Sequence, residues 1–183
     1  MGQRYSFYGL LKNPPTLSGG KTILRPKHMD DAFDDYQWRK DSELCRLDAT
    51  YPISSTYQEF YKLYKEQTRQ SDKALRFAIQ TLEGKHIGNC SCFNIDLDHS
   101  ETEVGIMIAD RDYWNQGYGA DALKTAVTYI FANTTIKRIH LKTLKWNIRA
   151  QKCFEKCGFS PCGQLNRGEY SFILMEIHPP QEE

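Results

Sequence analysis

No apolar run in this sequence is long enough to cross a membrane. The longest mainly apolar stretches are residues 104–109 and 126–132, whereas a spanning helix needs about 18 residues or more. The N-terminal residues also lack a charged start, an apolar run and a small-residue cleavage site, so no secretory signal is visible. We therefore expect a soluble, cytoplasmic protein without a membrane partner, whose cysteines stay reduced.

An excess of charge of one sign is missing as well. Lys and Arg total 24 against 23 for Asp and Glu, which makes the formal net charge +1. Proteins that hold nucleic acid through its phosphates usually carry a basic surface, so we expect no nucleic-acid partner. Apolar residues account for 40% of the 183, a composition typical of a globular domain with a substantial core.

The six cysteines lack the spacing of a zinc site. Cys90 and Cys92 are two positions apart and Cys153 and Cys157 are four apart, and neither spacing is that of a C-x2-C knuckle. The chain therefore predicts no metal, and the thiols are expected to serve as small core side chains. The alternative, a zinc-dependent interaction module, has no support in the sequence other than the presence of these cysteines.

Hydrophobic periodicity predicts a single mixed α/β domain. Strands are expected at 22–25, 76–80, 87–95, 101–108, 138–143, 159–163 and 170–177, and helices at 30–40, 56–64, 119–131 and 148–157. The three middle strands form a meander whose neighbours can pair antiparallel. Pro and Gly near both ends predict that residues 1–21 are an extension and 179–183 a tail, around a domain of 22–178.

A glycine-rich turn, Trp-Asn-Gln-Gly-Tyr-Gly at 114–119, opens the helix that follows strand 101–108. Five backbone N–H groups at this turn would have no intrahelical acceptor and would lie at the positive end of the helix dipole. They belong to Gln116, Gly117, Tyr118, Gly119 and Ala120. Such a turn predicts a pyrophosphate site. It is not a P-loop, because no Gly-Lys-Ser/Thr follows.

The same turn resembles the GNAT superfamily of acetyl-CoA-dependent N-acetyltransferases. The family motif is Arg/Gln-x-x-Gly-x-Gly/Ala, and this chain matches both glycines but has Trp114 in the first place. A second block agrees, with Asn147 and Ala150 in the family's Asn-x-x-Ala, followed by Gly158-Phe159 in its Gly-Phe. Residues 110–122 look like the RimJ/RimL branch, which includes spermidine acetyltransferases, and the likeness covers about residues 20 to 178.

The resemblance implies a GNAT domain with a central, twisted, mostly antiparallel sheet of six to seven strands and about four flanking helices. The sheet would splay apart beside residues 103–108. Pantetheine would enter the gap and pair with the backbone near Met107 and Ile108, with the pyrophosphate at residues 116–120. Asn147 would contact the cofactor and also cap the helix from Ile148. Acetyl-CoA is the implied cosubstrate.

Acetyl transfer requires a group that takes a proton from the amine. Glu103 is placed like the family's acidic residue with this role, and Glu101 is the second candidate because it lies on the same strand face. The alternative for Glu103 is an ordinary surface carboxylate. Many family members also have a Tyr that protonates the thiolate, and here Phe154 stands in its place without a proton to donate.

The resemblance further implies that the acceptor amine lies against the first two helices and the final hairpin, where Trp38, Tyr51 and Tyr170 are the candidate contacts. The branch likeness favours a protein N-terminal amine or a small amine as acceptor. Because Trp114 and Phe154 depart from the family pattern, the alternative is a catalytically weak CoA-binding or sensing domain. Pairing of exposed sheet edges would permit a homodimer.

Overall fold

The computed structural model describes residues 7–69 and 74–180. Its eight strands form one sheet in the order β1-β2-β3-β4-β5-β6-β8-β7. All neighbouring strands are antiparallel except β5 and β6, which are parallel. The strands are β1 Leu17–Ser18, β2 Thr22–Pro26, β3 Leu75–Thr81, β4 His86–Asp96, β5 Glu101–Ile108, β6 Arg138–Leu144, β7 Ser160–Arg167 and β8 Tyr170–Ile177.

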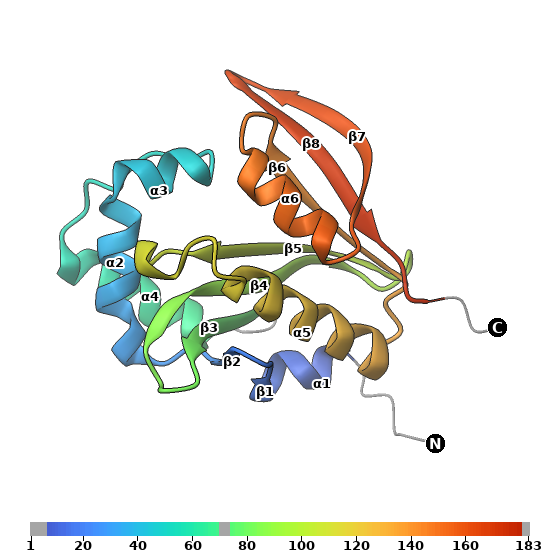
Figure 1. Ribbon diagram of the computed structural model, residues 1–183. Coiled ribbons are helices and arrows are strands. Elements are labelled where there is room, and N and C mark those ends of the chain that lie inside the picture. The colour runs from blue at the N-terminus through green and yellow to red at the C-terminus, as the bar shows by residue number, and fades with distance from the viewer. Residues whose placement is uncertain (1–6, 70–73, 181–183) are drawn as a thin grey trace.

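Helices cover both faces of this sheet (Figure 1). They are α1 Phe7–Lys12, α2 Ala32–Lys40, α3 Ser42–Leu47, α4 Tyr57–Arg69, α5 Tyr118–Asn133 and α6 Ile148–Lys156, with the 3-10 turns η1 Met29–Asp31 and η2 Arg111–Tyr113. The predicted mixed α/β fold with a mostly antiparallel sheet is confirmed. The structure describes one strand more than the six to seven expected, and six α-helices where about four were expected.

The additional elements are too short for periodicity to reveal. Strand β1 has two residues, and α1 and α3 have six each. Helix α3 is separated from α2 by Asp41, whose extended backbone ends one helix and whose Oδ1 accepts from Leu44 N at 2.9 Å to begin the next. A helix of six residues is too short for apolar positions to recur over two full turns, so this local cap is its main signal.

The described part of the N-terminal extension packs against the sheet and its core. Leu10 and Leu11 of α1 are 4% and 2% exposed, and Leu11 and Leu17 belong to the main apolar cluster. Strand β1 pairs antiparallel with β2. The prolines and glycines between residues 13 and 20 shape the connections of this segment, but they do not detach it from the domain.

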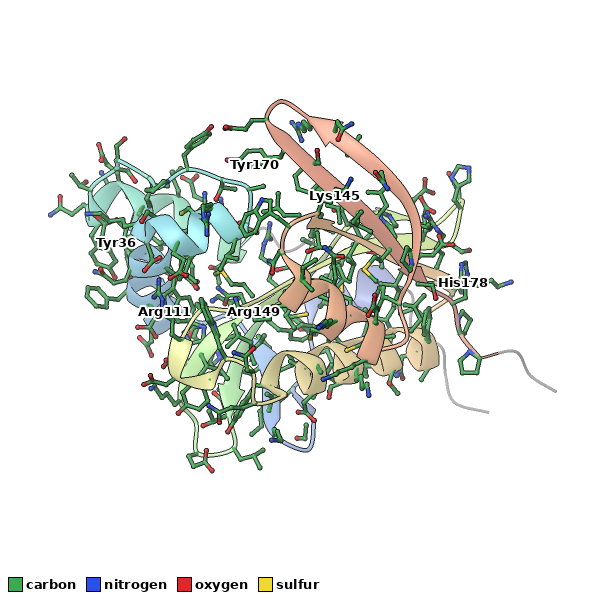
Figure 2. All side chains as sticks on the ribbon, turned by 45° about the horizontal axis from the view of Figure 1, so that its top comes forward. Tyr36, Arg111, Lys145, Arg149, Tyr170 and His178 are labelled. Carbon is green, nitrogen blue, oxygen red and sulfur yellow. The ribbon has the colours of Figure 1, made fainter. Side chains whose placement is uncertain are left out.

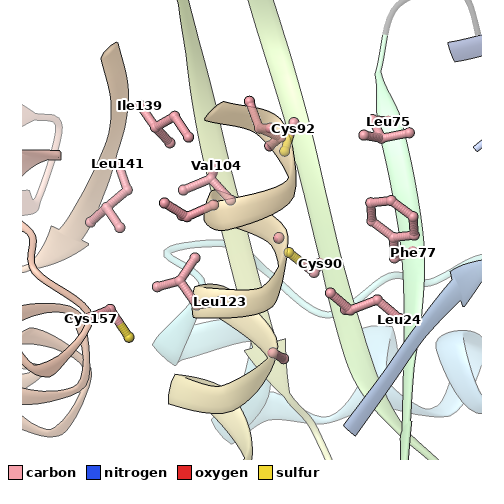
Figure 3. Packing of buried hydrophobic residues seen from close by; sticks show 14 of the residues in the cluster. Leu24, Leu75, Phe77, Cys90, Cys92, Val104, Leu123, Ile139, Leu141 and Cys157 are labelled. Carbon is pink, nitrogen blue, oxygen red and sulfur yellow. The ribbon is translucent and has the colours of Figure 1, made fainter. Parts of the chain in front are cut away.

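The core lies on the sheet face that packs against α5 and α6. Side chains at alternate positions of β3, β4 and β5 enter it, as period-two alternation requires. Figure 3 shows them around α5, with Leu75, Phe77, Cys90, Cys92, Val104 and Leu123 among the labelled residues. Cys45, Cys90, Cys92 and Cys157 are buried as expected, whereas Cys153 is partly exposed and Cys162 is exposed. The expectation of core thiols is therefore wrong for these last two.

Two local features hold the elements in place, and Thr56 and Glu59 of the first have the sequence spacing of a capping box. The capping box of α4 is present, since Thr56 N donates to Glu59 Oε2 at 2.8 Å and Glu59 N to Thr56 Oγ1 at 3.4 Å. Gly88 of β4 lies so close to β5 that an added Cβ would be 2.1 Å from the carbonyl oxygen of Met107. Only glycine allows this approach, which positions the end of β5.

Candidate active site

The sheet opens between β5 and β6. Within the described chain these strands pair only over residues 101–103 of β5 and 138–140 of β6. Beyond Glu103, β5 remains paired with β4 as far as Ile108, while β6 continues along β8. Figure 1 shows the two strands diverging from their paired ends. The gap expected beside residues 103–108 is present, and it exposes one backbone edge of β5.

A cavity of about 620 Å³ fills this gap. We call it the β5–β6 cavity. Its walls come from α3, from the end of β5, from the loop that leads into α5, and from α6. Of the residues predicted to bind cofactor, seven line it: Met107, Ile108, Gly117, Tyr118, Gly119, Ala120 and Asn147. Gln116, the eighth, lies in the same loop and is exposed.

The N-terminus of α5 faces the β5–β6 cavity with backbone donors that have no acceptor within the helix. Asp121 N donates to Gly117 O at 2.9 Å, so the N–H groups of residues 118–120 precede the first intrahelical bond. Gly117 has φ +87° and open space where a Cβ would lie. A side chain there would be strained and would cover the donors, which is the physical reason for glycine at this position.

The turn between β1 and β2 supports this loop, a role that the sequence did not reveal. Asp121 accepts from the backbone N–H groups of Gly20, Lys21 and Thr22 at 2.9, 3.0 and 2.9 Å, and from Thr22 Oγ1 at 2.7 Å. Lys21 Nζ donates to the carbonyl oxygen of Gln116 at 2.9 Å. The segment before residue 22 thus holds the start of α5.

Trp114 also has a role that its departure from the family motif concealed. Its indole Nε1 donates to Ile108 O at 2.7 Å, which ties the loop to the end of β5. The guanidinium of Arg149 lies 3.7 Å from the centroid of the Trp114 ring and that of Arg111 lies 5.5 Å away. Figure 2 shows the two arginines close together beside the opening. Three cations, Arg149, Lys152 and Lys156, line the β5–β6 cavity against one carboxylate, Asp48, so the charge of its lining is positive.

Asn147 caps α6 as predicted. Its side-chain oxygen accepts from Ala150 N at 3.2 Å, and the residue also lines the β5–β6 cavity. Phe154, two turns further on, is buried against Phe159 with ring centroids 6.3 Å apart. The ring lines the same cavity, so an apolar surface occupies the place of the family's tyrosine.

Glu103 and Glu101 lie on one face of β5, as their spacing predicts, and both meet cations of β6. Glu103 is 7% exposed and accepts from Lys142 Nζ and, at 2.8 Å, from Asn94 Nδ2. Glu101 accepts from Arg138 at 2.6 Å. Neither carboxylate lines the β5–β6 cavity or the α4 cavity described next. A buried carboxylate needs such compensation, since an unpaired charge there is costly.

His140 is a further titratable group at this point that sequence reasoning missed. It is the register partner of Glu103 on β6, at the last pair before the strands part. Burial, with the charge of Arg138 as the next cause, lowers the pKa of His140 below its ordinary value. The imidazole is therefore neutral at pH 7 and has a nitrogen lone pair available for a proton. Its signal in the sequence is weak, because the pairing of β5 with β6 is nonlocal.

A second cavity of about 620 Å³ lies on the other face of β5, beneath α4. We call it the α4 cavity. Met107 lines both cavities, so the two spaces meet at the end of β5. Trp38 lines the α4 cavity and packs against His86, with ring centroids 4.6 Å apart.

Tyr51 and Tyr170 come together away from Trp38. Tyr51 donates to Glu169 in the turn between β7 and β8, and hydrogen bonds with Glu169 and then Tyr170 raise the pKa of Tyr51 to about 12. Figure 2 shows Tyr170 on this hairpin. The three residues predicted to contact an acceptor therefore divide between the α4 cavity and the hairpin.

The model of the Acetyltransferase (GNAT) domain matches residues 21–160, from the β1–β2 turn through α6. The chain belongs to the GNAT acetyltransferase family. It is thus an acyltransferase that uses acetyl-CoA as cosubstrate. No group of three or more His, Cys, Asp or Glu side chains in the described part of the chain is arranged to hold a metal. None of the helices described is long and apolar enough to cross a membrane.

Relatives of this GNAT chain are distant in sequence. It is 25% identical to the N-acetyltransferase 9-like protein of Caenorhabditis briggsae, over 86% of this chain and 80% of the relative. It is 24% identical to the human alpha/beta-tubulin-N-acetyltransferase 9, over 78% and 74% of the two chains. Vibrio cholerae spermidine N-acetyltransferase, solved with CoA and spermine, shares the fold with a TM-score of 0.77 at 21% identity, covering 86% of this chain and 95% of that one.

Proposed function

We propose that this protein moves the acetyl group of acetyl-CoA directly to a primary amine. The observation that carries the proposal is the β5–β6 cavity. It joins the N–H donors at the start of α5, cationic side chains, and an edge of β5 that pairs with no described strand beyond Glu103. These are the features needed by a ligand with phosphates at one end and a chain of amides at the other.

In the proposed arrangement the pyrophosphate binds the N–H groups of residues 116–120. Pantetheine amides pair with the β5 backbone near Met107 and Ile108. The carbonyl oxygen of Ile108 is already bonded to Trp114, so pairing there would use other backbone groups of this segment. Arg149, Lys152 and Lys156 offset the charge of the phosphates.

The acceptor enters from the α4 cavity, because this space meets the β5–β6 cavity at Met107. The amine nitrogen attacks the thioester carbonyl, the C–S bond breaks, and CoA leaves as a thiolate. A thiol pKa of about 8.5 makes this a fair leaving group without the missing tyrosine. Trp38 is a proposed contact of the acceptor, and Tyr51 and Tyr170 are proposed contacts at the hairpin.

Glu103 is the proposed group that takes the amine proton, through water, with Glu101 as the second candidate. Its support is its place on the acceptor-side face of β5, next to the point where the strands part. In this role Glu103 must exchange its bond with Lys142 for one with water. His140 beside it is neutral and is the third group able to accept the proton.

Two acceptor classes fit the family resemblance, a protein N-terminal amine and a small amine. A relative named for tubulin acetylation supports the first class, and a neighbour solved with spermine supports the second. Membership of the RimJ/RimL-like branch remains a prediction.

The test is turnover of acetyl-CoA with a panel of polyamines, aminoglycosides, amino acids and short peptides with free N-termini. The acetylated product should be measured by mass spectrometry, because the exposed Cys162 and the cavity-lining Cys153 would consume a thiol reagent. An acetylated acceptor is expected. Failure to bind acetyl-CoA in calorimetry would overturn the proposal, and binding without any turnover would favour the sensing domain instead.

Substitutions then identify the base. Glu103→Gln is expected to lower kcat by about 10²-fold or more, within the range for loss of a general base, and to leave acetyl-CoA affinity unchanged. His140→Gln is the matched comparison from the neighbouring strand. If Glu103→Gln retains full kcat while His140→Gln removes the acidic limb of the pH–rate profile, the histidine is the base.

A further inference from the structure

The α4 cavity has an unusual balance of charge. Its charged lining residues within the described chain are four cations and one carboxylate, namely Lys12, Lys27, Arg39, Arg76 and Asp35. Lys27 and Asp35 neutralise each other, with Nζ and Oδ2 2.6 Å apart. Arg39 faces Asp48 at 3.6 Å in an exposed pair, which is worth little. The cavity therefore retains positive charge, although an enzyme for polyamines would be expected to present carboxylates.

Arg76 is the cation of this set that lies on the floor of the cavity. It belongs to β3, where its neighbours Leu75 and Phe77 point into the core, so its side chain emerges on the α4 face. It is half-buried, and it forms no hydrogen bond or ion pair with the residues that the structure describes. A guanidinium has five donors and matches carboxylate oxygens in pairs. Left unpaired in a cavity, it is a binding group for an anion.

The sheet connects Arg76 with the end of β5. Arg76 pairs in register with Ser91 of β4, which pairs with Gly105 of β5. Ser91 and Gly105 are small, but the ring of Phe93 lies over Gly105, where an added Cβ would be 3.2 Å from Phe93 Cε1. The ring closes one side of the row, and Arg76 can extend along the other side, toward Met107. Adjacent strands are about 4.8 Å apart, and an extended arginine side chain covers most of the distance across two of them. An anion held by Arg76 would thus lie a few bonds from an amine at Met107.

We propose that the acceptor carries a carboxylate a few bonds from its reactive amine, as in an amino acid or a peptide with an acidic first residue, and that Arg76 binds this carboxylate. The inference rests on the proposed function and names the substrate class of the same site. Polyamines would be poor acceptors for this site, because the positive charge of the cavity repels their ammonium groups.

The experiment compares acceptors that differ only in charge. Short peptides beginning with Glu or with Gln, glutamate against glutamine amide, and putrescine are each assayed with acetyl-CoA. They are also titrated into the CoA-bound protein, so that an acceptor that does not react still reports its affinity. We expect at least a tenfold preference in kcat/KM, or in affinity, for the acidic member of each pair.

Arg76→Gln should remove this preference and leave the neutral peptide and acetyl-CoA binding unchanged. Arg46→Gln is the matched control, because Arg46 is exposed on α3, where its guanidinium lies 4.7 Å from the Trp146 ring centroid. Equal values for acidic and neutral acceptors, a preference for putrescine, or a preference that survives in Arg76→Gln would overturn the inference. Those outcomes leave the proposed function intact, whereas failure to bind acetyl-CoA would overturn both.

Discussion

Cys153 lines the β5–β6 cavity, and its thiol can be used to test whether a ligand occupies that cavity. The thiol lies beside Gly119, where an added Cβ would be 3.7 Å from Sγ. The neighbouring Cys157 thiol, and then the charges of Lys156 and Arg149, lower the pKa of Cys153 below its ordinary value. Burial instead raises the pKa of Cys90 to about 12. Thiolates are the reactive form, so reactivity within the folded protein should concentrate at Cys153.

We predict that iodoacetamide labels Cys153 at pH 7.5 and that saturating CoA slows this labelling at least fivefold, since the cofactor would cover the thiol. Rates are measured by mass spectrometry of the separate peptides. Cys162 on β7 is the internal control, because it is exposed and lines neither cavity. Labelling of Cys153 that is indifferent to CoA would place the cofactor elsewhere.

At the scale of elements, the contact between the β1–β2 turn and α5 decides the shape of the phosphate loop. Four donors of residues 20–22 converge on the carboxylate of Asp121, and these bonds lower its pKa against the opposing effect of burial. Gly19 leaves no room for a side chain here, as an added Cβ would lie 2.3 Å from Asp121 Oδ2. Helix and turn are thus joined by one side chain.

Asp121→Ala is predicted to lower the free energy of unfolding by about 2 to 3 kcal/mol, because it leaves several donors without their acceptor. Acetyl-CoA affinity should fall as well, since Lys21 would no longer be held against Gln116. Urea unfolding and calorimetry measure the two effects. Asp112→Ala removes an exposed carboxylate from the nearby turn η2 and should change neither. An unfolding midpoint for Asp121→Ala equal to that of the parent protein would refute this account.

At the scale of the whole molecule, stability depends on carboxylates whose pKa values are lowered in the folded state. Asp31 is 2% exposed and receives two hydrogen bonds from the Arg25 guanidinium, at 2.9 and 2.7 Å, and one from His28 N at 2.7 Å. These bonds outweigh burial and lower the pKa of Asp31 to about 2. Hydrogen bonds donated by nearby backbone or side-chain groups also lower the pKa values of five other carboxylates, namely Asp41, Glu59, Asp96, Asp121 and Glu176.

Stability should therefore decline in acid. A pKa that is lower in the folded than in the unfolded state contributes stability above the unfolded value, and the contribution is lost as pH falls through the folded value. For Asp31 the window runs from 3.8 down to about 2. Asp31→Asn is predicted to cost about 2 kcal/mol at pH 7 and to flatten the decline between pH 4 and 2, as measured by urea unfolding at each pH. The exposed Asp30→Asn is the control, and equal stability of the two variants at pH 7 would contradict the prediction.

Sequence alone determined those parts of this protein that depend on near neighbours in the chain. The glycine turn before α5, the Asn147 cap and the Thr56–Glu59 capping box each rest on contacts within a few residues. Alternation along 101–108 placed Glu101 and Glu103 on one face for the same reason. The family resemblance added the gap beside β5, which no local pattern contains.

Tertiary structure alone decided which side chains meet across the gap and what charge each cavity keeps. Lys142 reaches Glu103 across 39 positions of sequence, and Lys21 reaches Gln116 across 95. Among the described residues Arg76 has no hydrogen-bond or ion-pair partner and lines the α4 cavity, and Trp114 is bonded to Ile108 by the path of its loop. Such contacts follow from the order and register of the strands. Strands pair through backbone groups that are common to every residue, so side-chain identity alone does not predict these contacts.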